Sequence, residues 1–194
     1  MRKNGVIMEV VRLTERDLRK TYRRHVRFDF PKSERKPLKY MLMALREGTY
    51  EPFGLFEEGK LLAYGFFVTT GKHRLLDYLA TVRDKRGMGF GSKFLSMLRE
   101  TLTEAESVVA EAENPDFAEN EADRALRLRR LAFYGRNGFS DTTVRSTTFG
   151  VEYVVIELDL HGLHTPDEVR DIFRAHYRTV LPEDLFEKNI RVHD

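Results

Sequence analysis

The sequence of 194 residues predicts a mixed α/β (α+β) fold: a mostly antiparallel, twisted sheet of about seven strands, with helices on both faces and extra helices at the C-terminus. Three observations predict it. Apolar, β-prone segments joined by short turns follow one another over residues 50–82, which is typical of antiparallel strands. A strand, a helix and another strand follow over residues 75–112, which indicates a crossover between parallel neighbours. A final pair of strands precedes a helix start at Thr165.

The length of 194 residues fits one domain, or one domain with an appendage. The apolar fraction of 41% is enough for a core, and the net charge is only +2. The absence of cysteine excludes disulfides, zinc–thiolate sites and a cysteine nucleophile. No apolar run approaches the roughly 20 residues that span a bilayer, and no apolar stretch typical of a signal peptide follows the first five residues. We therefore expect no membrane association and a cytoplasmic location, with residues 1–5 as a frayed leader and Met8 as an alternative start to Met1.

The chain begins with a predicted strand over residues 6–13. Thr14 then serves as the N-cap of a helix over residues 15–27, with Asp17 completing a capping box. A Phe-Asp-Phe-Pro break at residues 28–31 ends this helix, and a second helix is predicted over residues 34–46. Eleven Lys or Arg stand against three acids between Arg16 and Arg46, a local charge of +8. This basic stripe is either a solvated helix face or a surface for an anion, such as RNA, another polyanion or a cofactor's phosphates.

The same periodicity and turn signals place the remaining elements. A Glu58-Gly59 turn joins the first two of the following strands into a hairpin. The remaining predicted strands are 50–57, 61–69, 75–82, 107–112, 141–148 and 151–160. The remaining predicted helices are 88–102, 121–136, 166–180 and a short one after Pro182.

A glycine-rich loop lies between the strand 75–82 and the helix that begins near Met88. Gly87, Gly89 and Gly91 allow an anion to approach the backbone at the helix N-terminus, where free N–H groups and the helix dipole favour negative charge. The residue order excludes a P-loop, and Ser92 stands where a dinucleotide fingerprint needs its third glycine. The remaining pattern is Arg86-x-x-Gly89-x-Gly91 in the loop after the strand that ends at Val82.

This pattern resembles the acetyl-CoA signature of the GNAT superfamily of N-acetyltransferases. A second motif supports the resemblance, because Phe133-Tyr134, three residues and then Gly138-Phe139 is similar to the Phe-Tyr-x-x-x-Gly-Phe motif of that family. Both motifs occur in the family's order. The resemblance covers residues 6–160, so we expect a GNAT core over residues 1–160 and a helical extension, residues 161–194, packed on the same domain. That extension either forms a homodimer or covers the substrate pocket.

The resemblance implies a sheet whose fourth and fifth strands, 75–82 and 107–112, splay apart around acetyl-CoA. It implies that the backbone of Ala80 and Val82 binds the pantetheine arm and the acetyl carbonyl. It implies that Tyr134 contacts the cofactor near its sulfur. The backbone amides that would hold the pyrophosphate belong to Arg86, Gly87, Met88, Gly89, Phe90, Gly91 and Ser92.

The expected reaction is direct attack of an amine on the thioester. Tyr134, whose phenol has an ordinary pKa near 10, is the expected proton donor to the thiolate, and the Ala80 amide is the candidate oxyanion donor. Glu111 and Glu113, on one face of the fifth strand by the period-two rule, are the candidate bases. Asp77 is a rival, and the family often manages with ordered water.

Local charge suggests the acceptor. Eight acids and no Lys or Arg lie between Glu104 and Asp123, which would attract a cationic amine of a small molecule or a protein. Arg127 and Arg130 stand where many relatives carry Asn and a small residue, so they either reach cofactor phosphates or lie in solvent. The competing interpretation is a non-catalytic module that senses acyl-CoA. Only two histidines, His161 and His164, lie close in sequence, and no metal site is expected.

Overall fold

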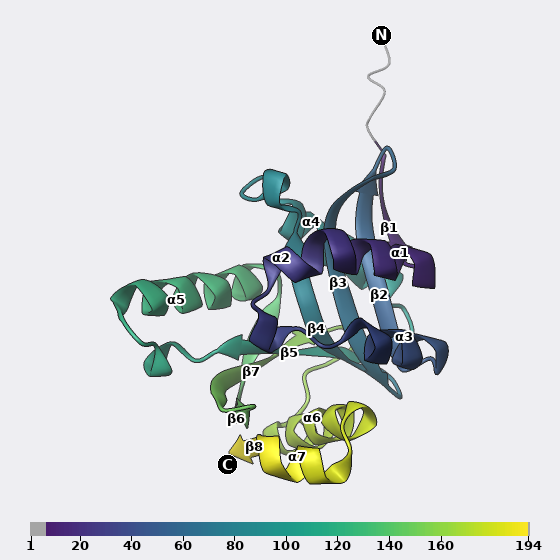
Figure 1. Cartoon of the computed structure of the whole chain (residues 1–194). Coiled ribbons are helices and arrows are strands. Elements are labelled where there is room, and N and C mark those ends of the chain that lie inside the picture. The colour runs from purple at the N-terminus through teal and green to yellow at the C-terminus, as the bar shows by residue number, and fades with distance from the viewer. Residues whose placement is uncertain (1–6, 194) are drawn as a thin grey trace. The chain divides into compact units, whose positions relative to one another are not determined.

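The structure is a computed structural model that describes residues 7–193 (Figure 1). The expectations for residues 1–5 and for Met1 lie outside this range. None of the described helices combines the length and apolar character needed to cross a membrane.

The described strands form one mixed sheet, in the order β1-β2-β3-β4-β5-β7-β6-β8. β4 and β5 are parallel, whereas β1–β2, β5–β7, β6–β7 and β6–β8 are antiparallel. The mostly antiparallel mixed sheet is confirmed, but the prediction of about seven strands missed β8. The strands are β1 (Met8–Arg12), β2 (Tyr50–Glu57), β3 (Lys60–Thr70), β4 (His73–Thr81), β5 (Ser107–Glu113), β6 (Phe139–Thr148), β7 (Val151–Asp159) and β8 (Ile190–His193).

The helices fall close to their predicted bounds, with one exception. The second helix was predicted from residue 34 but begins at Leu38. Pro37 restricts the residue before it to extended conformations, so the preceding segment cannot be helical up to that point. The first helix continues past α1 through a π-helical turn, Tyr22–Val26, into α2. The helices are α1 (Glu15–Thr21), α2 (Arg27–Asp29), α3 (Leu38–Arg46), α4 (Phe90–Thr101), α5 (Glu121–Arg136), α6 (Pro166–Val180) and α7 (Glu183–Asn189).

The described chain divides into two compact units. The first comprises residues up to 67 together with 77–103, and the second comprises residues 68–76 together with 104 onward. β3 and β4 therefore contribute residues to both units. The segment after residue 160, with α6, α7 and β8, belongs to the second unit.

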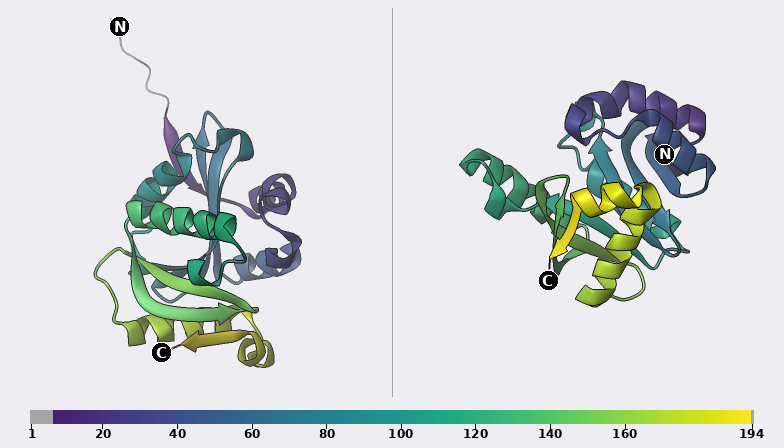
Figure 2. Two further views of the ribbon diagram at one scale, coloured as in Figure 1. Left: turned by 90° about the vertical axis from the view of Figure 1, so that its left-hand side faces the viewer. Right: turned by 60° about the horizontal axis from the view of Figure 1, so that its bottom comes forward.

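Helices cover both faces of the strands in the first unit (Figure 2). A Cβ at Gly65 of β3 would lie 2.7 Å from the Phe94 ring, so α4 approaches this face closely because residue 65 is glycine. Since side chains alternate along a strand, the neighbouring Tyr64 points to the other face, where its hydroxyl donates to Asp29 at the end of α2. The predicted capping box of α1 is present between Thr14 and Asp17.

The second unit is built on β5, β7, β6 and β8, with α5, α6 and α7 packed against them (Figure 2). Its core contains wholly buried side chains from β5, β7 and α6, including Val108, Val155 and Phe173. α6 starts at a capping box in which Thr165 and Glu168 exchange hydrogen bonds, and it packs on β6, α7 and β8. The helix start predicted at Thr165 is confirmed.

Candidate active site

The loop after β4 leads into an uncapped helix N-terminus in the first unit. A short helical turn, Arg83–Lys85, is followed by Gly87 and Gly89, whose φ angles of +77° and +83° favour glycine. No side chain caps α4 at its N-terminus. A Cβ at Gly87 or Gly89 would meet no atom within 4 Å, so the backbone here borders open space. Exposed amides at a helix N-terminus suit a diphosphate, so these residues fit the cofactor that the sequence suggests.

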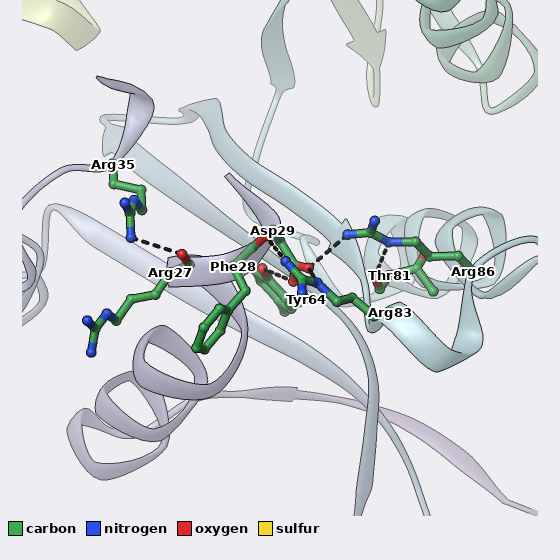
Figure 3. A network of polar contacts seen from close by, with 8 residues as sticks. All are labelled: Arg27, Phe28, Asp29, Arg35, Tyr64, Thr81, Arg83 and Arg86. Atoms are coloured by element: carbon green, nitrogen blue, oxygen red, sulfur yellow. Dashed lines mark hydrogen bonds and ion pairs between the residues drawn. The ribbon is translucent and has the colours of Figure 1, made fainter. Parts of the chain in front are cut away.

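A buried carboxylate holds this loop to α2 (Figure 3). The side chain of Asp29 is only 1% exposed, and it accepts hydrogen bonds from Arg86 Nη2 at 2.8 Å and from Arg83 Nε at 3.2 Å. The Tyr64 hydroxyl donates to the same carboxylate at 2.9 Å, and Arg83 also donates to the Phe28 carbonyl. The guanidinium groups are therefore turned toward Asp29, and Arg86 can serve the anion cradle through its backbone.

The backbone of Val82 is already engaged. Its N–H donates to the Leu62 carbonyl at 2.9 Å, and its carbonyl accepts from the Lys85 N–H at 2.8 Å. A pantetheine arm at Val82 would have to displace or share these bonds, so this finding speaks against Val82 as a cofactor contact. Ala80, the residue before the last one of β4, stays the candidate backbone donor.

Tyr134 lines a pocket of about 330 Å³ in the second unit. The tyrosine lies on α5 and is 9% exposed. Burial raises the pKa of Tyr134 to about 12, so the phenol keeps its proton at neutral pH and can act as a donor. The other lining residues are Asn114, Pro115, Asp116, Leu131, Gly135, Phe139, Asp141, Arg145, Val154 and Ile156.

The second sequence motif has a packing role around this tyrosine. Gly138 ends the helix region with a φ of +90°, which turns the chain into β6. Phe139 begins that strand, and its ring packs against Tyr134 with centroids 5.1 Å apart and planes at 66°. The Phe133 ring contacts Tyr134 as well, at 5.5 Å. The aromatic pair and the Gly-Phe step therefore fix the orientation of the phenol.

Three hydroxyl groups bind the carboxylate of Glu111. Oε1 accepts from Ser146 at 3.0 Å and from Thr148 at 2.6 Å, both on β6, and Oε2 accepts from Tyr177 on α6. Tyr177 belongs to the C-terminal extension, and the sequence carries no signal for this contact. The side chain of Glu111 is therefore engaged by both β6 and α6.

The β5–β7 register places Glu111 and the Tyr134 pocket on opposite faces of the sheet. Glu111 pairs with Val155, whereas the pocket is lined by Val154 and Ile156 on either side of it. Because successive side chains in a strand point to opposite faces, the Glu111 carboxylate points away from the pocket. The structure therefore does not bring Glu111 and Tyr134 together on one face.

Glu113 is paired with the two arginines of α5 that depart from the family pattern. Arg130 Nη1 donates to its carboxylate, and Arg127 Nη2 lies 4.0 Å from it. Arg127 is buried, donates to the Asn114 carbonyl at 2.9 Å and pairs with Asp123 at 2.9 Å. In this structure both arginines brace the β5–α5 connection.

Asp77, the rival base, lies in the first unit and is also engaged. Lys36 Nζ lies 2.6 Å from Oδ1, and the Tyr50 hydroxyl donates to Oδ2 at 2.7 Å. Burial, followed by the charge of Asp77, raises the pKa of Tyr50 well above its ordinary value, so this hydroxyl remains a donor. The arrangement is that of a structural ion pair, with no feature specific to proton transfer.

The acidic run is partly neutralised by bases from elsewhere in the second unit. Glu106 pairs with Lys72 at 2.6 Å, and Asp123 and Glu113 pair with the arginines of α5. Asp116 is exposed and lines the Tyr134 pocket. Of the acids predicted to attract an amine, Asp116 is thus the one that borders this pocket.

The basic stripe lines a surface hollow on α1 and the π-helical turn. Among its members, Arg19 and Arg46 pair with Glu15, both at 2.7 Å. The hollow is lined by Glu15, Arg16, Arg19, Lys20, Arg23 and Arg24. These contacts are compatible with both readings of the stripe, a solvated face and an anion-binding surface.

Comparison with solved structures identifies the architecture. No family model and no curated protein matches the sequence. A GNAT-family acetyltransferase from Bacteroides thetaiotaomicron, described as putative, matches with a TM-score of 0.69 and 19% identity, over 89% of this chain and 97% of its own. This chain has the GNAT fold.

Two further structures with the GNAT fold have described acceptors or ligands. The ribosomal-protein-S18-alanine N-acetyltransferase from Escherichia coli matches with a TM-score of 0.59 and 21% identity, over 81% of this chain and 97% of its own. AAC(6')-Ib in complex with paromomycin and acetyl-CoA matches with a TM-score of 0.57 and 19% identity, over 78% of this chain and 93% of its own.

Proposed function

We propose that this protein is an N-acetyltransferase that transfers an acetyl group from acetyl-CoA to a primary amine by direct attack. The observation that carries the proposal is the uncapped N-terminus of α4 behind Gly87 and Gly89, in a chain with the GNAT fold. AAC(6')-Ib, which has the same fold, was solved with acetyl-CoA. Acetyl-CoA, when bound, supplies the activated acetyl thioester.

The backbone amides from Arg86 to Ser92 would hold the diphosphate in this proposal. Gly87, Met88, Gly89, Phe90 and Gly91 lie between them in sequence. The first-turn amides of α4 have no intrahelical acceptor and carry the positive end of the helix dipole, so they favour an anion without any cationic side chain. This fits the orientation of Arg83 and Arg86 toward Asp29.

Tyr134 would donate its phenolic proton to the departing thiolate. Its pKa of about 12 keeps that proton in place at neutral pH, and its aromatic neighbours fix the ring. The Ala80 amide would donate to the carbonyl oxygen as negative charge develops there. Tyr134 would thus act as a general acid and the Ala80 amide as a hydrogen-bond donor, and neither forms a bond to the acetyl group, which is consistent with a direct transfer in a chain without cysteine.

The amine must lose a proton, and Glu111 and Glu113 stay the candidate carboxylates for this step, with Glu111 on the face of the sheet opposite the Tyr134 pocket. Each carboxylate already has partners: three hydroxyls around Glu111 and Arg130 beside Glu113. A water in contact with the carboxylate would therefore mediate the proton transfer. Together with Asp116 at the Tyr134 pocket, these charges favour a cationic acceptor, either a small molecule or a protein amine.

Release of free thiol from acetyl-CoA tests the proposal. The full chain should release thiol in the presence of at least one member of a panel of polyamines, aminoglycosides and peptides with a free N-terminal amine. Binding of CoA should be measured by calorimetry on the same preparation. Tight CoA binding without thiol release above the amine-free rate would overturn the proposed acetyltransferase activity and favour the non-catalytic module that senses acyl-CoA. No CoA binding at all would overturn both.

A further inference from the structure

Three potential metal ligands gather at one end of the second unit, although they are far apart in sequence. His73 is the first residue of β4, Glu106 directly precedes β5, and His164 lies in the loop before α6. One ligand atom from each lies within 4.8 Å of the other two. His161 and His164 lie close in sequence, but His161 is not part of this cluster. The other two members are His73 and Glu106, which lie at the starts of two different strands.

The parallel β4–β5 ladder builds the first part of the cluster. His73 pairs with Ser107, and the Glu106 N–H donates to the Lys72 carbonyl at 2.8 Å. These backbone bonds fix the chain on both sides, so His73 and Glu106 are neighbours because of the sheet register. The position of both groups is therefore set by secondary structure, and only their side-chain rotation is left open.

The wholly buried carboxylate of Glu157 holds the second histidine, His164, in position. Glu157 on β7 has an exposed fraction of 0%, and its two oxygens lie 2.6 Å from His164 Nδ1 and 3.2 Å from the His164 backbone N–H. A ring that donates from Nδ1 to a carboxylate presents its Nε2 lone pair. Metal-binding histidines are commonly oriented in this way.

His73 has a comparable arrangement. Its Nδ1 lies 3.2 Å from the Ser107 hydroxyl, and its ring packs edge-on against His164 with centroids 5.1 Å apart. Both rings therefore have a polar partner at Nδ1 and lie side by side.

Negative charge also lies at the cluster, opposed by Lys72 and by the buried Arg74 next to His73. Glu106 and the buried Glu157 are both acidic, and Lys72 is the base paired with Glu106, at 2.6 Å. The Lys72 side chain is 69% exposed, so it can move into solvent when a metal ion binds. One oxygen of Glu106 faces Lys72, and the carboxylate has a second oxygen to offer.

We propose that His73, His164 and Glu106 form a binding site for one divalent transition-metal ion, with zinc the best fit and water as the fourth ligand. Two imidazoles and a carboxylate with one open position are a ligand set that zinc accepts. Zinc bonds of about 2.1 Å place tetrahedral ligands about 3.4 Å apart, so the side chains must close in slightly. All three are only partly buried, which allows that movement.

The metal ion would act as a structural clip. It joins the start of β4 and the start of β5 to the loop that leads into α6, so it would stabilise the attachment of the C-terminal extension. The three ligands share no residue with the lining of the Tyr134 pocket. The site therefore does not depend on the proposed acetyl transfer, and it can be tested without an activity assay.

Titration of the untagged full chain with zinc tests the site. After treatment with EDTA and its removal, the protein should bind one equivalent of zinc in competition with a chromophoric chelator, and its melting temperature should rise with saturation. His73→Ala and His164→Ala should each weaken binding by at least about tenfold, the scale on which even outer partners act. His161→Ala, the matched control from the same loop, should leave both readouts unchanged.

Cobalt substitution gives a second readout and guards against variants that fail to fold. The cobalt-loaded chain should show the visible absorption of a four-coordinate site, and this absorption should be lost in Glu106→Gln, which changes only a partly exposed side chain. The site is overturned if the wild-type chain binds no stoichiometric zinc. It is equally overturned if Glu106→Gln, His73→Ala and His164→Ala bind like the wild type, or if His161→Ala loses binding to the same extent.

Discussion

The Arg86 guanidinium donates to the buried carboxylate of Asp29 at 2.8 Å, across 57 positions of sequence. This bond ties the glycine loop that precedes α4 to the end of α2. It explains why an arginine of the glycine motif points into the protein although a phosphate is expected nearby. Arg86 therefore positions the loop, and in the proposed site the backbone amides would bind the diphosphate.

Asp29→Asn should weaken CoA binding. The substitution removes the anionic partner of Arg83 and Arg86, so the loop loses its fixed position, and we expect the Kd for CoA to rise by roughly five- to tenfold, about 1–1.4 kcal/mol. Asp84→Asn, an exposed acid of the same loop, is the matched control and should leave the Kd unchanged. Calorimetry measures both, and equal Kd values for the two variants would contradict the positioning role.

Gly89→Ala should separate backbone strain from loss of cofactor binding. Gly89 has a φ of +83° and Gly48, in an exposed turn, has +77°, and a Cβ at either position meets no atom within 4 Å. Alanine at each should therefore cost a similar amount of stability, about 1 kcal/mol. Only Gly89→Ala places a methyl group at the anion cradle, so only it should raise the Kd for CoA, by about tenfold or more. A comparable rise in Gly48→Ala would refute this assignment.

Glu111→Gln and Glu113→Gln should each impair acetyl transfer to a cationic amine. If the carboxylate mediates loss of the amine proton, kcat falls; if it attracts the amine, KM rises. Glu119→Gln, an exposed acid of the same run, serves as the control. Steady-state kinetics across pH distinguish the two roles, because only the first shifts the acidic limb of the kcat profile. Unchanged kinetics in both variants would remove these residues from the site.

The stabilisation that Glu15 gives the first unit should be lost in acid. Hydrogen bonds from Arg46, then Arg19, lower the pKa of Glu15 to about 2 from an ordinary value of 4.5. Because the folded-state pKa is depressed, the stabilisation is fully present above pH 4.5 and is lost as the pH falls toward 2. Urea unfolding should therefore show Glu15→Gln less stable than the wild type at pH 7 and equal to it near pH 2. Glu47→Gln, at the end of α3, should differ little at pH 7.

Local patterns were sufficient for much of the fold and for the elements on which the candidate site residues lie. The glycine loop, the aromatic pair at Tyr134 and the capping boxes of α1 and α6 each depend on residues within a few positions of one another. Their physical cause is local, so the sequence carries it. The start of α3 was wrong because the Pro37 restriction outweighs a favourable apolar stripe.

Contacts between distant segments could not be predicted in this way. Nothing near Asp29 indicates Arg86, and nothing near Glu111 indicates Tyr177, 66 positions away. The predicted common face of Glu111 and Glu113 did not lead to common partners, because Glu113 ends its strand and reaches α5. β8 was missed because four residues directly after a helix carry too few alternations to indicate a strand.

The measurement that tests the central claim most directly is single-turnover transfer of the acetyl group from acetyl-CoA to an accepted amine, followed by thiol release, in Tyr134→Phe and in the wild-type chain. The variant keeps the ring and its packing but removes the one O–H group that we assign to the thiolate. We predict that the variant is slower by at least about a hundredfold, the usual contribution of a positioned acid. The Kd for CoA should change by no more than about twofold, which is about 0.4 kcal/mol. Thiol release by Tyr134→Phe at the wild-type rate would contradict the account.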